Sequence, residues 1–165
     1  MERFRPPGII VDIGGGNGSV AGKLVQAGFP TVVVEPGETF ARNAARRGVA
    51  MVICATLDVA HFRAASVPAA CAFDVLEHIE KDLEFMREIH RCLVPGGRLY
   101  VTVPAYAWLW SDDDNNAGRH RRYTCSSLRA RLGRRSYVKL HRARMLWLTS
   151  KAGRWELGCL RRGRL

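Results

Sequence analysis

The sequence predicts an α/β fold in which helices cover both faces of a mostly parallel β-sheet, a three-layer, doubly wound arrangement. Two observations predict it. Strand and helix signals alternate along residues 8–103, and the strands are continuous apolar runs, as in strands buried on both faces. Apolar residues make up 47% of the 165 residues, which is enough for one hydrophobic core and leaves little for a second. We therefore expect one domain.

The first half of the chain alternates short strands and helices. An amphipathic helix after the first strand ends at Gly28, a residue that favours the left-handed conformation of a helix cap. The β-branched run TVVVE predicts a buried strand, and Gly48 stops the helix that follows it. The predicted elements are strands at residues 8–13, 31–35 and 49–54 and helices at residues 19–27 and 38–47.

The second half continues this alternation as far as residue 103. Apolar residues recur at helical spacing from Leu83 to Leu93, and the Pro-Gly-Gly at 95–97 ends that helix. Regularity then fails, and the final twenty residues predict no element. The predicted elements are strands at residues 69–74 and 98–103, a long loop at 104–124, a short helix at 126–132 and a sixth strand at 137–142.

A glycine-rich turn follows the first strand directly. Asp12 ends the apolar run, and four glycines come before the next helix: Gly14, Gly15, Gly16 and Gly18. Glycines at this place let the backbone approach a ligand closely and leave the N–H groups of the helix end free to bind it. The turn is thus a candidate nucleotide or nucleoside site.

The spacing of the glycines separates two ligand classes. The dinucleotide fingerprint needs a sixth-position glycine, but counting from Gly14 that position is Ser19. A nicotinamide-dependent oxidoreductase is therefore the less favoured interpretation. Glu35 closes the second strand, where a carboxylate can accept hydrogen bonds from both hydroxyls of a ribose. Together, the turn and this acid favour a nucleoside ligand over a plain turn and a surface carboxylate.

Four segments in order resemble the successive motifs of the class I methyltransferases that use S-adenosylmethionine, of the ubiquinone or type 11 kind: VDIGGGNG, VVVEPG, FDVLEHI and LVPGGRLYVTVPA. The resemblance spans residues 8–124. It implies a Rossmann-like methyltransferase core over residues 1–132. We expect this core to lack its last strand and to be truncated at both ends, with a basic segment at 133–165 that is either partial sheet completion or poorly ordered.

The resemblance also implies an activity and a cofactor. The chain would be an enzyme that transfers a methyl group from S-adenosylmethionine to an oxygen or nitrogen of a small-molecule or lipid-like acceptor. Asp12, Gly14, Gly16 and Gly18 would hold the methionine portion, and Glu35 would hold the ribose. Gly15 and Pro36 would also bind the cofactor, and the stretch 56–58 that ends at Asp58 would flank the adenine.

A second cluster of polar residues follows the fourth strand. Asp74, Glu77 and His78 stand at i, i+3 and i+4, so on a helical turn they would share one face at the carboxyl end of the sheet. We expect them to act in catalysis, His78 as the base that removes a proton from the acceptor, and Asp74 to contact the cofactor also. Two readings stay open: a metal site, which we do not assign, and a helix cap.

The loop at 104–124 follows the fifth strand and would overhang the site. Its Gly118-Arg-His-Arg-Arg-Tyr run resembles a run that closes a similar loop in related bacterial methyltransferases. We expect Trp108, His120, Arg122 and Tyr123 to contact the substrate, because they offer apolar area and positive charge for an acidic or phosphorylated acceptor. The alternative is a solvated loop anchored by one tryptophan.

Charge is distributed unevenly along the chain. Residues 1–118 hold 11 Lys/Arg and 14 Asp/Glu, whereas residues 119–165 hold 15 Lys/Arg and a single acid, Glu156. Such a tail is attracted to nucleic acid or to anionic lipid. An alternative function is therefore a catalytically weak module that binds RNA or an anionic membrane surface through the tail. No obligate protein partner is predicted.

The sequence argues against several classes of protein. The chain has no apolar run of the roughly 20 residues that a membrane span needs and no signal-peptide pattern at its start. Its five cysteines are scattered, without a Cys-x-x-Cys pair, which favours a reducing cytoplasm over a disulfide framework. An adenine amino methyltransferase would show Asn/Asp-Pro-Pro-Tyr/Phe after the fourth strand and a cytosine C5 methyltransferase Pro-Cys. The chain has neither.

Overall fold

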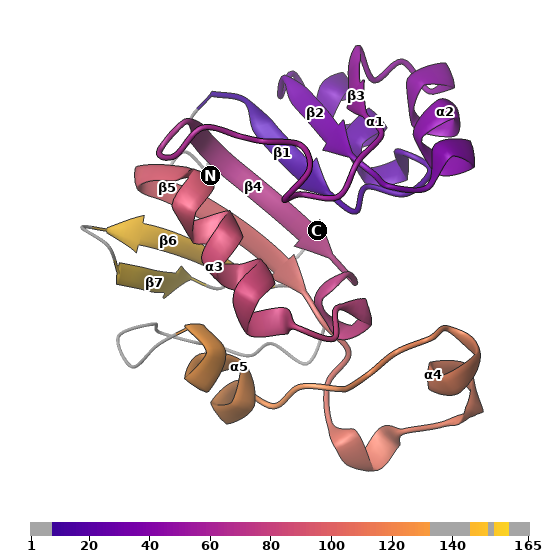
Figure 1. Cartoon of the computed structure of the whole chain (residues 1–165), viewed down its shortest axis with the longest axis vertical. Coiled ribbons are helices and arrows are strands. Elements are labelled where there is room, and N and C mark those ends of the chain that lie inside the picture. Colours follow the sequence, from indigo (N-terminus) through magenta and orange to yellow (C-terminus); the bar gives the residue numbers. More distant parts are fainter. Residues whose placement is uncertain (1–7, 133–145, 152–153, 159–165) are drawn as a thin grey trace, which may run out of the picture.

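A computed structural model describes residues 8–132, 146–151 and 154–158. It contains one seven-stranded sheet with the strand order β3-β2-β1-β4-β5-β6-β7. Neighbouring strands from β3 to β5 are parallel, and β6 and β7 are antiparallel to their neighbours. The predicted mostly parallel sheet is confirmed (Figure 1).

The elements match most of the predicted ones to within one to three residues at each end. The strands are β1 Ile10–Ile13, β2 Thr31–Val34, β3 Met51–Ile53, β4 Val67–Phe73, β5 Leu93–Thr102, β6 Leu146–Lys151 and β7 Arg154–Gly158. The helices are α1 Ser19–Gln26, α2 Glu38–Arg46, α3 Asp82–Cys92, α4 Asp112–Asn116 and α5 Cys125–Leu132, with single 3-10 turns η2 Leu76–His78 and η3 Ala107–Leu109.

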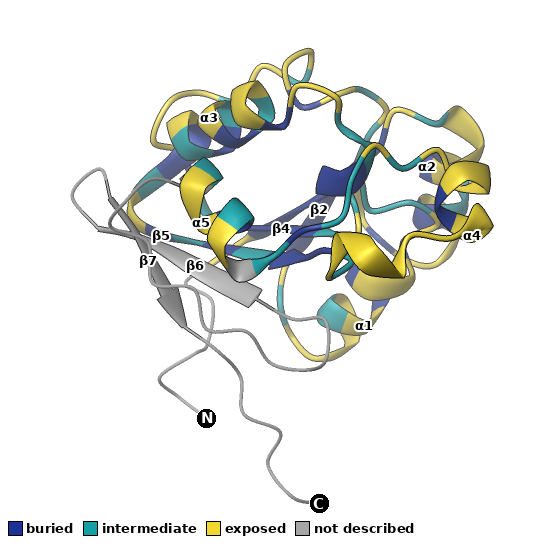
Figure 2. Ribbon diagram, turned by 90° about the horizontal axis from the view of Figure 1, so that it is seen from below, coloured by how far each residue is buried: buried dark blue, intermediate teal, exposed yellow. Residues whose placement is uncertain are grey.

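Helices cover both faces of the sheet, as Figures 1 and 2 show, and an apolar layer lies between the helices and the sheet on each face. On one face, Met86 and Ile89 of α3 and Leu128 of α5 pack against the larger part of the sheet. On the other face, Ala21 of α1 and Ala44 of α2 pack around Val33. Helices on both faces leave the two ends of the sheet as the places where polar groups can gather.

The parallel register brings the carboxyl ends of β1, β2 and β4 together. Asp12 pairs with Val33 on one side and with Cys71 on the other, so the residues that follow each strand emerge side by side. Ligands of open α/β sheets bind at this end. The fold thus places the glycine turn, the Glu35 carboxylate and the Asp74 turn at one edge.

The start of β5 differs from the predicted strand. The strand begins at Leu93, directly after α3, and pairs Val67 with Leu93 and then Ala69 with Arg98, so an irregularity separates the two pairs. The Pro-Gly-Gly run lies within this irregularity, where Gly96 has a φ of 81°. The Pro-Gly-Gly run therefore interrupts β5, whereas we expected it to separate the helix from the strand.

The edge of the sheet after β5 corrects two expectations. Where we expected the last strand to be lacking and the final twenty residues to form no element, β6 pairs with β5 and β7 pairs with β6. The strand residues LWLTSK and RWELG are rich in Trp, Leu and Thr, which favour strands, but the surrounding arginines and glycines concealed this signal. The predicted strand at 137–142 lies outside the described residues.

The segment 104–124 is a long excursion from the sheet that carries η3 and α4. A bridge between Ala105 and Tyr123 closes its base, and Tyr106 N–H donates to Tyr123 O over 2.9 Å. The predicted loop is therefore a closed, partly helical arm, seen at the lower right of Figure 1. Among the helices that the structure describes, none is long and apolar enough to cross a membrane.

Candidate functional site

A pocket of about 900 Å³ opens at the carboxyl ends of β1, β2 and β4. The turns after these strands form one wall, the stretch 55–58 forms a second, and α3 with Ala117 of the arm forms a third. Its lining residues are Ile13, Gly14, Gly16, Asn17, Val34, Glu35, Pro36, Phe40, Ala55, Thr56, Leu57, Asp58, Asp74, Val75, His78, Ile79, Lys81, Glu84, Phe85, Glu88 and Ala117.

The glycine turn is shaped by three residues with positive φ. Gly14, Gly16 and Gly18 have φ of 66°, 51° and 73°. A Cβ on Gly14 would lie 2.7 Å from Val75 Cγ2, and one on Gly18 would lie 2.7 Å from the Ala44 Cβ, so both positions are closed by packing. A Cβ on Gly16 would meet nothing within 4 Å. Gly16 therefore presents bare backbone to the pocket.

Glu35 fixes the turn from the neighbouring strand. Its Oε2 accepts a hydrogen bond from Gly16 N–H and its Oε1 accepts one from Gly37 N–H, both at 2.9 Å. The side chain is buried but lines the pocket. Two charge-assisted bonds hold the carboxylate in one orientation, with lone pairs remaining for hydroxyl donors.

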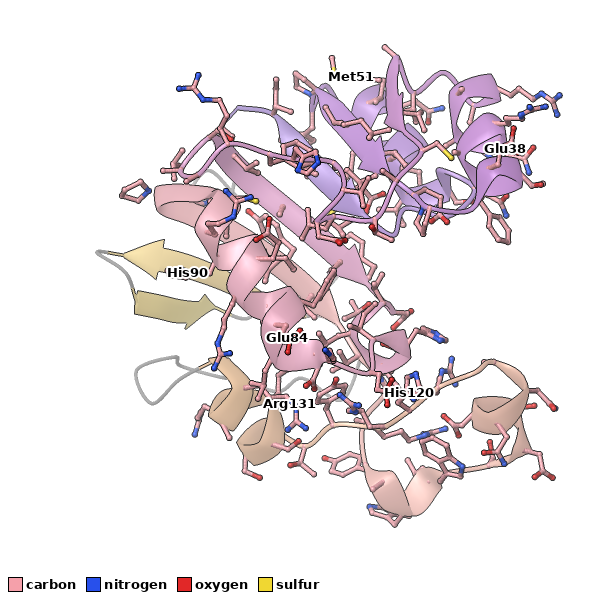
Figure 3. The ribbon with its side chains drawn as sticks, in the orientation of Figure 1. Glu38, Met51, Glu84, His90, His120 and Arg131 are labelled. Atoms are coloured by element: carbon pink, nitrogen blue, oxygen red, sulfur yellow. The ribbon has the colours of Figure 1, made fainter. Side chains whose placement is uncertain are left out.

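Sequence reasoning missed most of the far wall. Leu57 belongs to the predicted stretch 56–58, but Phe85 and Glu88 of α3, which line the pocket with it, were not predicted. Glu84, labelled in Figure 3, projects from the same helix. Spacings of three and four residues from Lys81 put these α3 residues on one face, but only the topology shows that this face borders a pocket.

Asp74 lies in a conformation that few non-glycine residues adopt. Its φ is 54°, and its backbone N–H is held by both oxygens of Thr102, the carbonyl at 3.0 Å and Oγ1 at 2.9 Å. The Thr102 hydroxyl in turn donates to Asp74 Oδ1 over 3.0 Å. These bonds offset the local strain and fix the carboxylate at the pocket wall.

Glu77 and His78 occupy different environments. Glu77 has no exposed surface, does not line the pocket, and has no hydrogen-bond partner for either oxygen. Burial raises its pKa to about 7, helped by repulsion from Asp74 and opposed by Arg119, whose Nε lies 3.8 Å from Oε1. His78 does line the pocket, and its Nδ1 lies 3.4 Å from Gly118 O.

The expected face of three polar residues is therefore not formed. Asp74 and His78 reach the pocket, whereas Glu77 points into the core, because the chain makes only a single 3-10 turn here and not an α-helix. Within the ranges that the structure describes, no group of three His, Cys, Asp or Glu side chains could hold a metal ion.

Arg122 is anchored inside the arm. Its Nε lies 2.9 Å from Asp114 Oδ1 and its Nη2 lies 2.7 Å from Asp114 Oδ2, a two-bond pair. Arg119 Nη1 adds a third contact at 3.1 Å. Asp114 has no exposed surface, and the Arg122 guanidinium holds its pKa well below the usual range. This pair fixes the arm and does not line the pocket.

Tyr123 lies in the core beneath the arm. Its hydroxyl oxygen lies 3.0 Å from Asp82 Oδ2 and 3.1 Å from Leu76 O, so its one proton is shared between these two acceptors. Asp82 also pairs with Arg121 and Arg131, and these bonds lower its pKa although burial alone would raise it. Tyr123 therefore joins the arm to η2 and α3, and it does not line the pocket.

The other two predicted substrate residues are exposed. Trp108 is 77% exposed at the tip of the arm, with its ring 5.9 Å from that of Tyr106. The backbone of His120 donates to Glu77 O over 2.8 Å, which places it beside η2 (Figure 3), and its side chain faces solvent. Neither residue lines the pocket.

Three predicted cofactor residues also lie outside the pocket lining: Asp12, Gly15 and Gly18. Asp12 is 2% exposed, and a Cβ on Gly15 would lie 2.9 Å from its Oδ2. It therefore lies directly beneath the turn. The structure brings together the remaining members of the predicted set: Gly14, Gly16, Glu35, Pro36, Asp58 and Asp74.

A family model described as "Methyltransferase domain" matches residues 11–101, more than half of the chain. This range contains β2 to β4, all but one residue of β1 and of β5, and most of the pocket wall. No curated protein matches the chain.

Solved structures share the fold at low identity. A methyltransferase of Thermotoga maritima, described as a possible histamine N-methyltransferase, is 23% identical with a TM-score of 0.65 over 77% of this chain and 62% of that one. A putative methyltransferase of Haloferax volcanii, solved with a methyltransferase activator, is 19% identical with a TM-score of 0.67 over 75% and 58%.

A third structure was solved with ligands. It is a phosphoethanolamine N-methyltransferase of Haemonchus contortus, in complex with phosphomonomethylethanolamine and S-adenosylhomocysteine. It is 20% identical with a TM-score of 0.61 over 74% of this chain and 31% of that one. The chain thus spans less than two thirds of the length of these structures.

Proposed function

Since this chain belongs to the methyltransferase domain family, we propose that it transfers a methyl group from S-adenosylmethionine to an oxygen or nitrogen of a small-molecule or lipid-like acceptor. One observation carries the proposal: Glu35 and the open backbone of Gly16 meet at the pocket wall, joined by a hydrogen bond of 2.9 Å. A carboxylate beside bare backbone suits the ribose and the amino-acid portion of this cofactor.

The described residues fit the cofactor in three parts. Gly14 and Gly16 would hold the methionine portion, with Asp12, Gly15 and Gly18 shaping the turn from below, and Asp74 would bind at its side. Glu35, with Pro36, would accept the ribose hydroxyls. Leu57 and Phe85 offer apolar surface for a purine, and Asp58 offers an acceptor for its amino group.

When bound, S-adenosylmethionine supplies a methyl group on a sulfonium, which is already an activated electrophile. The protein's task is therefore to orient the acceptor and to exclude water. A carbonyl oxygen only accepts hydrogen bonds, so the contact of His78 Nδ1 with Gly118 O favours a proton on Nδ1. Nε2 would then be the atom that takes a proton from the acceptor.

The acceptor would enter beside the arm, because Ala117 of the arm lines the pocket. Trp108 and His120 are the exposed members of the predicted substrate set and would meet it there. Arg122 and Tyr123 would act indirectly by holding the arm. Glu77, which is buried, would act through Arg119 in the same way.

Titration calorimetry with S-adenosylhomocysteine tests the proposal. We expect the wild type to bind it and not to bind NADH. Glu35→Ala should weaken binding at least about tenfold, since it removes acceptors of charge-assisted bonds. Glu38→Ala, an exposed acid three residues further on, should bind as the wild type does. A preference for NADH, or full binding by Glu35→Ala, would exclude this function.

The basic tail favours a second candidate, a module that binds RNA or an anionic membrane. Its basis is the 10 Lys/Arg against one acid in residues 133–165. Replacing Arg161, Arg162 and Arg164 with Gln separates the two functions, because it lowers the charge of the tail and keeps β6 and β7 in the sheet. RNA or lipid binding should weaken if the tail binds these ligands, whereas binding of S-adenosylhomocysteine should be unchanged.

A further inference from the structure

A buried thiol lies next to the acid beneath the glycine turn. Asp12 of β1 and Cys71 of β4 are direct partners in the parallel register, so their side chains stand on the same face of the sheet. Both are buried, at 2% and 1% exposed. Neither lines the pocket.

The thiol forms a hydrogen bond with only one of the two carboxylate oxygens. Cys71 Sγ–H donates to Asp12 Oδ1 over 3.1 Å, whereas Asp12 Oδ2 has no hydrogen-bond partner. Oδ2 is the atom closest to the Cβ position of Gly15, at 2.9 Å. The free oxygen is therefore the one that faces the turn.

The surroundings of Asp12 oppose its ionisation. Burial raises its pKa to about 6, the Cys71 hydrogen bond opposes this rise, and the nearby Glu35 carboxylate adds to it. Burial also raises the pKa of Cys71 well above its usual value, so it remains a thiol and a donor. Val33, Ala21 and Ala44, which pack on this face, carry no charge. Tyr100 of β5 is the register partner of Cys71 and packs on the same face, and burial raises its pKa, so it stays neutral where Asp12 titrates.

We propose that Cys71 is a positioning residue of the cofactor site: its thiol holds Oδ1 of Asp12, which favours the carboxylate form and leaves Oδ2 beneath the turn that binds the cofactor's methionine portion. This inference rests on the proposed function. S-adenosylmethionine carries a sulfonium and an ammonium. A negative charge below the turn attracts both of these cationic groups without direct contact, because interactions between charges in a buried site are weakly screened by water and salt.

Binding of the cofactor should therefore follow the ionisation of Asp12. Affinity for S-adenosylmethionine should be full well above pH 6, where Asp12 is ionised, and fall as the pH drops through about 6. S-adenosylhomocysteine lacks the sulfonium charge, so its affinity should fall less. Removing the thiol should move the fall to higher pH, since the hydrogen bond that favours the carboxylate is lost.

Calorimetry between pH 5 and 7 tests this with Cys71→Ala, Cys71→Ser and a matched buried thiol, Cys92→Ala. We expect the midpoint of S-adenosylmethionine binding to rise by about half a pH unit or more in Cys71→Ala. The hydroxyl of Cys71→Ser donates as the thiol does and should keep the wild-type midpoint, as should Cys92→Ala. Melting temperatures report whether each variant is folded.

A carbon-13 NMR titration of Asp12 in the ligand-free chain gives an independent readout. The Asp12 midpoint should rise in Cys71→Ala. Unchanged binding and NMR midpoints in Cys71→Ala, or equal shifts in Cys71→Ala and Cys71→Ser, would overturn the inference alone. A folded wild type that binds neither ligand at any pH would overturn the proposed function and this inference with it.

Discussion

The carboxylate of Glu35 accepts a hydrogen bond from the backbone N–H of Gly16 at 2.9 Å. This bond joins the turn after β1 to the end of β2. Both residues line the pocket, and Gly16 has a φ of 51°, a backbone conformation that residues with a side chain rarely adopt. The turn is thus held open by a contact between two strand ends and by the absence of a side chain.

The first prediction compares Gly16→Ala with Gly28→Ala. Both glycines have positive φ, 51° and 81°, and a Cβ at either would meet nothing within 4 Å. Left-handed strain should lower the free energy of unfolding in each variant by about 1 kcal/mol. Only Gly16→Ala should also weaken binding of S-adenosylhomocysteine, because its methyl group projects into the pocket. Urea denaturation and calorimetry measure the two effects.

Gly28→Ala is the control, since Gly28 ends α1 away from the pocket. If both variants lose binding equally, the cause is general destabilisation. If neither does, Gly16 does not face the ligand.

Local patterns in the sequence predicted the parallel sheet and the glycine turn. Buried strands such as TVVV and the glycines after Asp12 are readable within ten residues, and the carboxyl ends of parallel strands must meet at one edge. Glu35 could therefore be placed beside Gly16 without a structure.

The roles of the arm could not be predicted in this way. Arg122 and Tyr123 have the residue types of a substrate site, but their partners, Asp114 and Asp82, are 8 and 41 residues away. A sequence shows charge and aromaticity but not which buried acid neutralises them. The prediction that Glu77 shares a face with Asp74 and His78 was wrong for a related reason, because the direction of its side chain depends on whether one turn is α-helical or 3-10.

The second prediction concerns Asp114, the buried acid of the arm. Asp114→Asn removes the charge that pairs with Arg119 and Arg122 and leaves two half-buried guanidinium groups with weaker partners. Amide exchange of residues 104–124 should become at least about tenfold faster, since one charge-assisted bond is worth more than that factor. Exchange in β1 and β4 should not change.

Asp112→Asn is the matched control, an exposed acid two residues earlier in the same helix. It should leave the exchange of the arm as in the wild type. Equal protection of the arm in both variants would show that the Asp114 pairs do not hold it.

The third prediction follows from Glu77, whose pKa is raised by burial from 4.5 to about 7. A folded-state pKa above the unfolded one means that the folded chain holds the proton more tightly. The resulting stability is complete below pH 4.5 and is lost as the pH rises through 7. The loss is at most about 3 kcal/mol, given 1.36 kcal/mol for each pKa unit. Glu77→Gln cannot ionise, so its free energy of unfolding should fall less than that of the wild type between pH 5 and 8.

Urea denaturation across this range measures the difference, and Glu80→Gln, an exposed neighbour, should follow the wild type. Parallel curves for Glu77→Gln and the wild type would mean that Glu77 is already ionised at pH 5, with Arg119 neutralising it in the core.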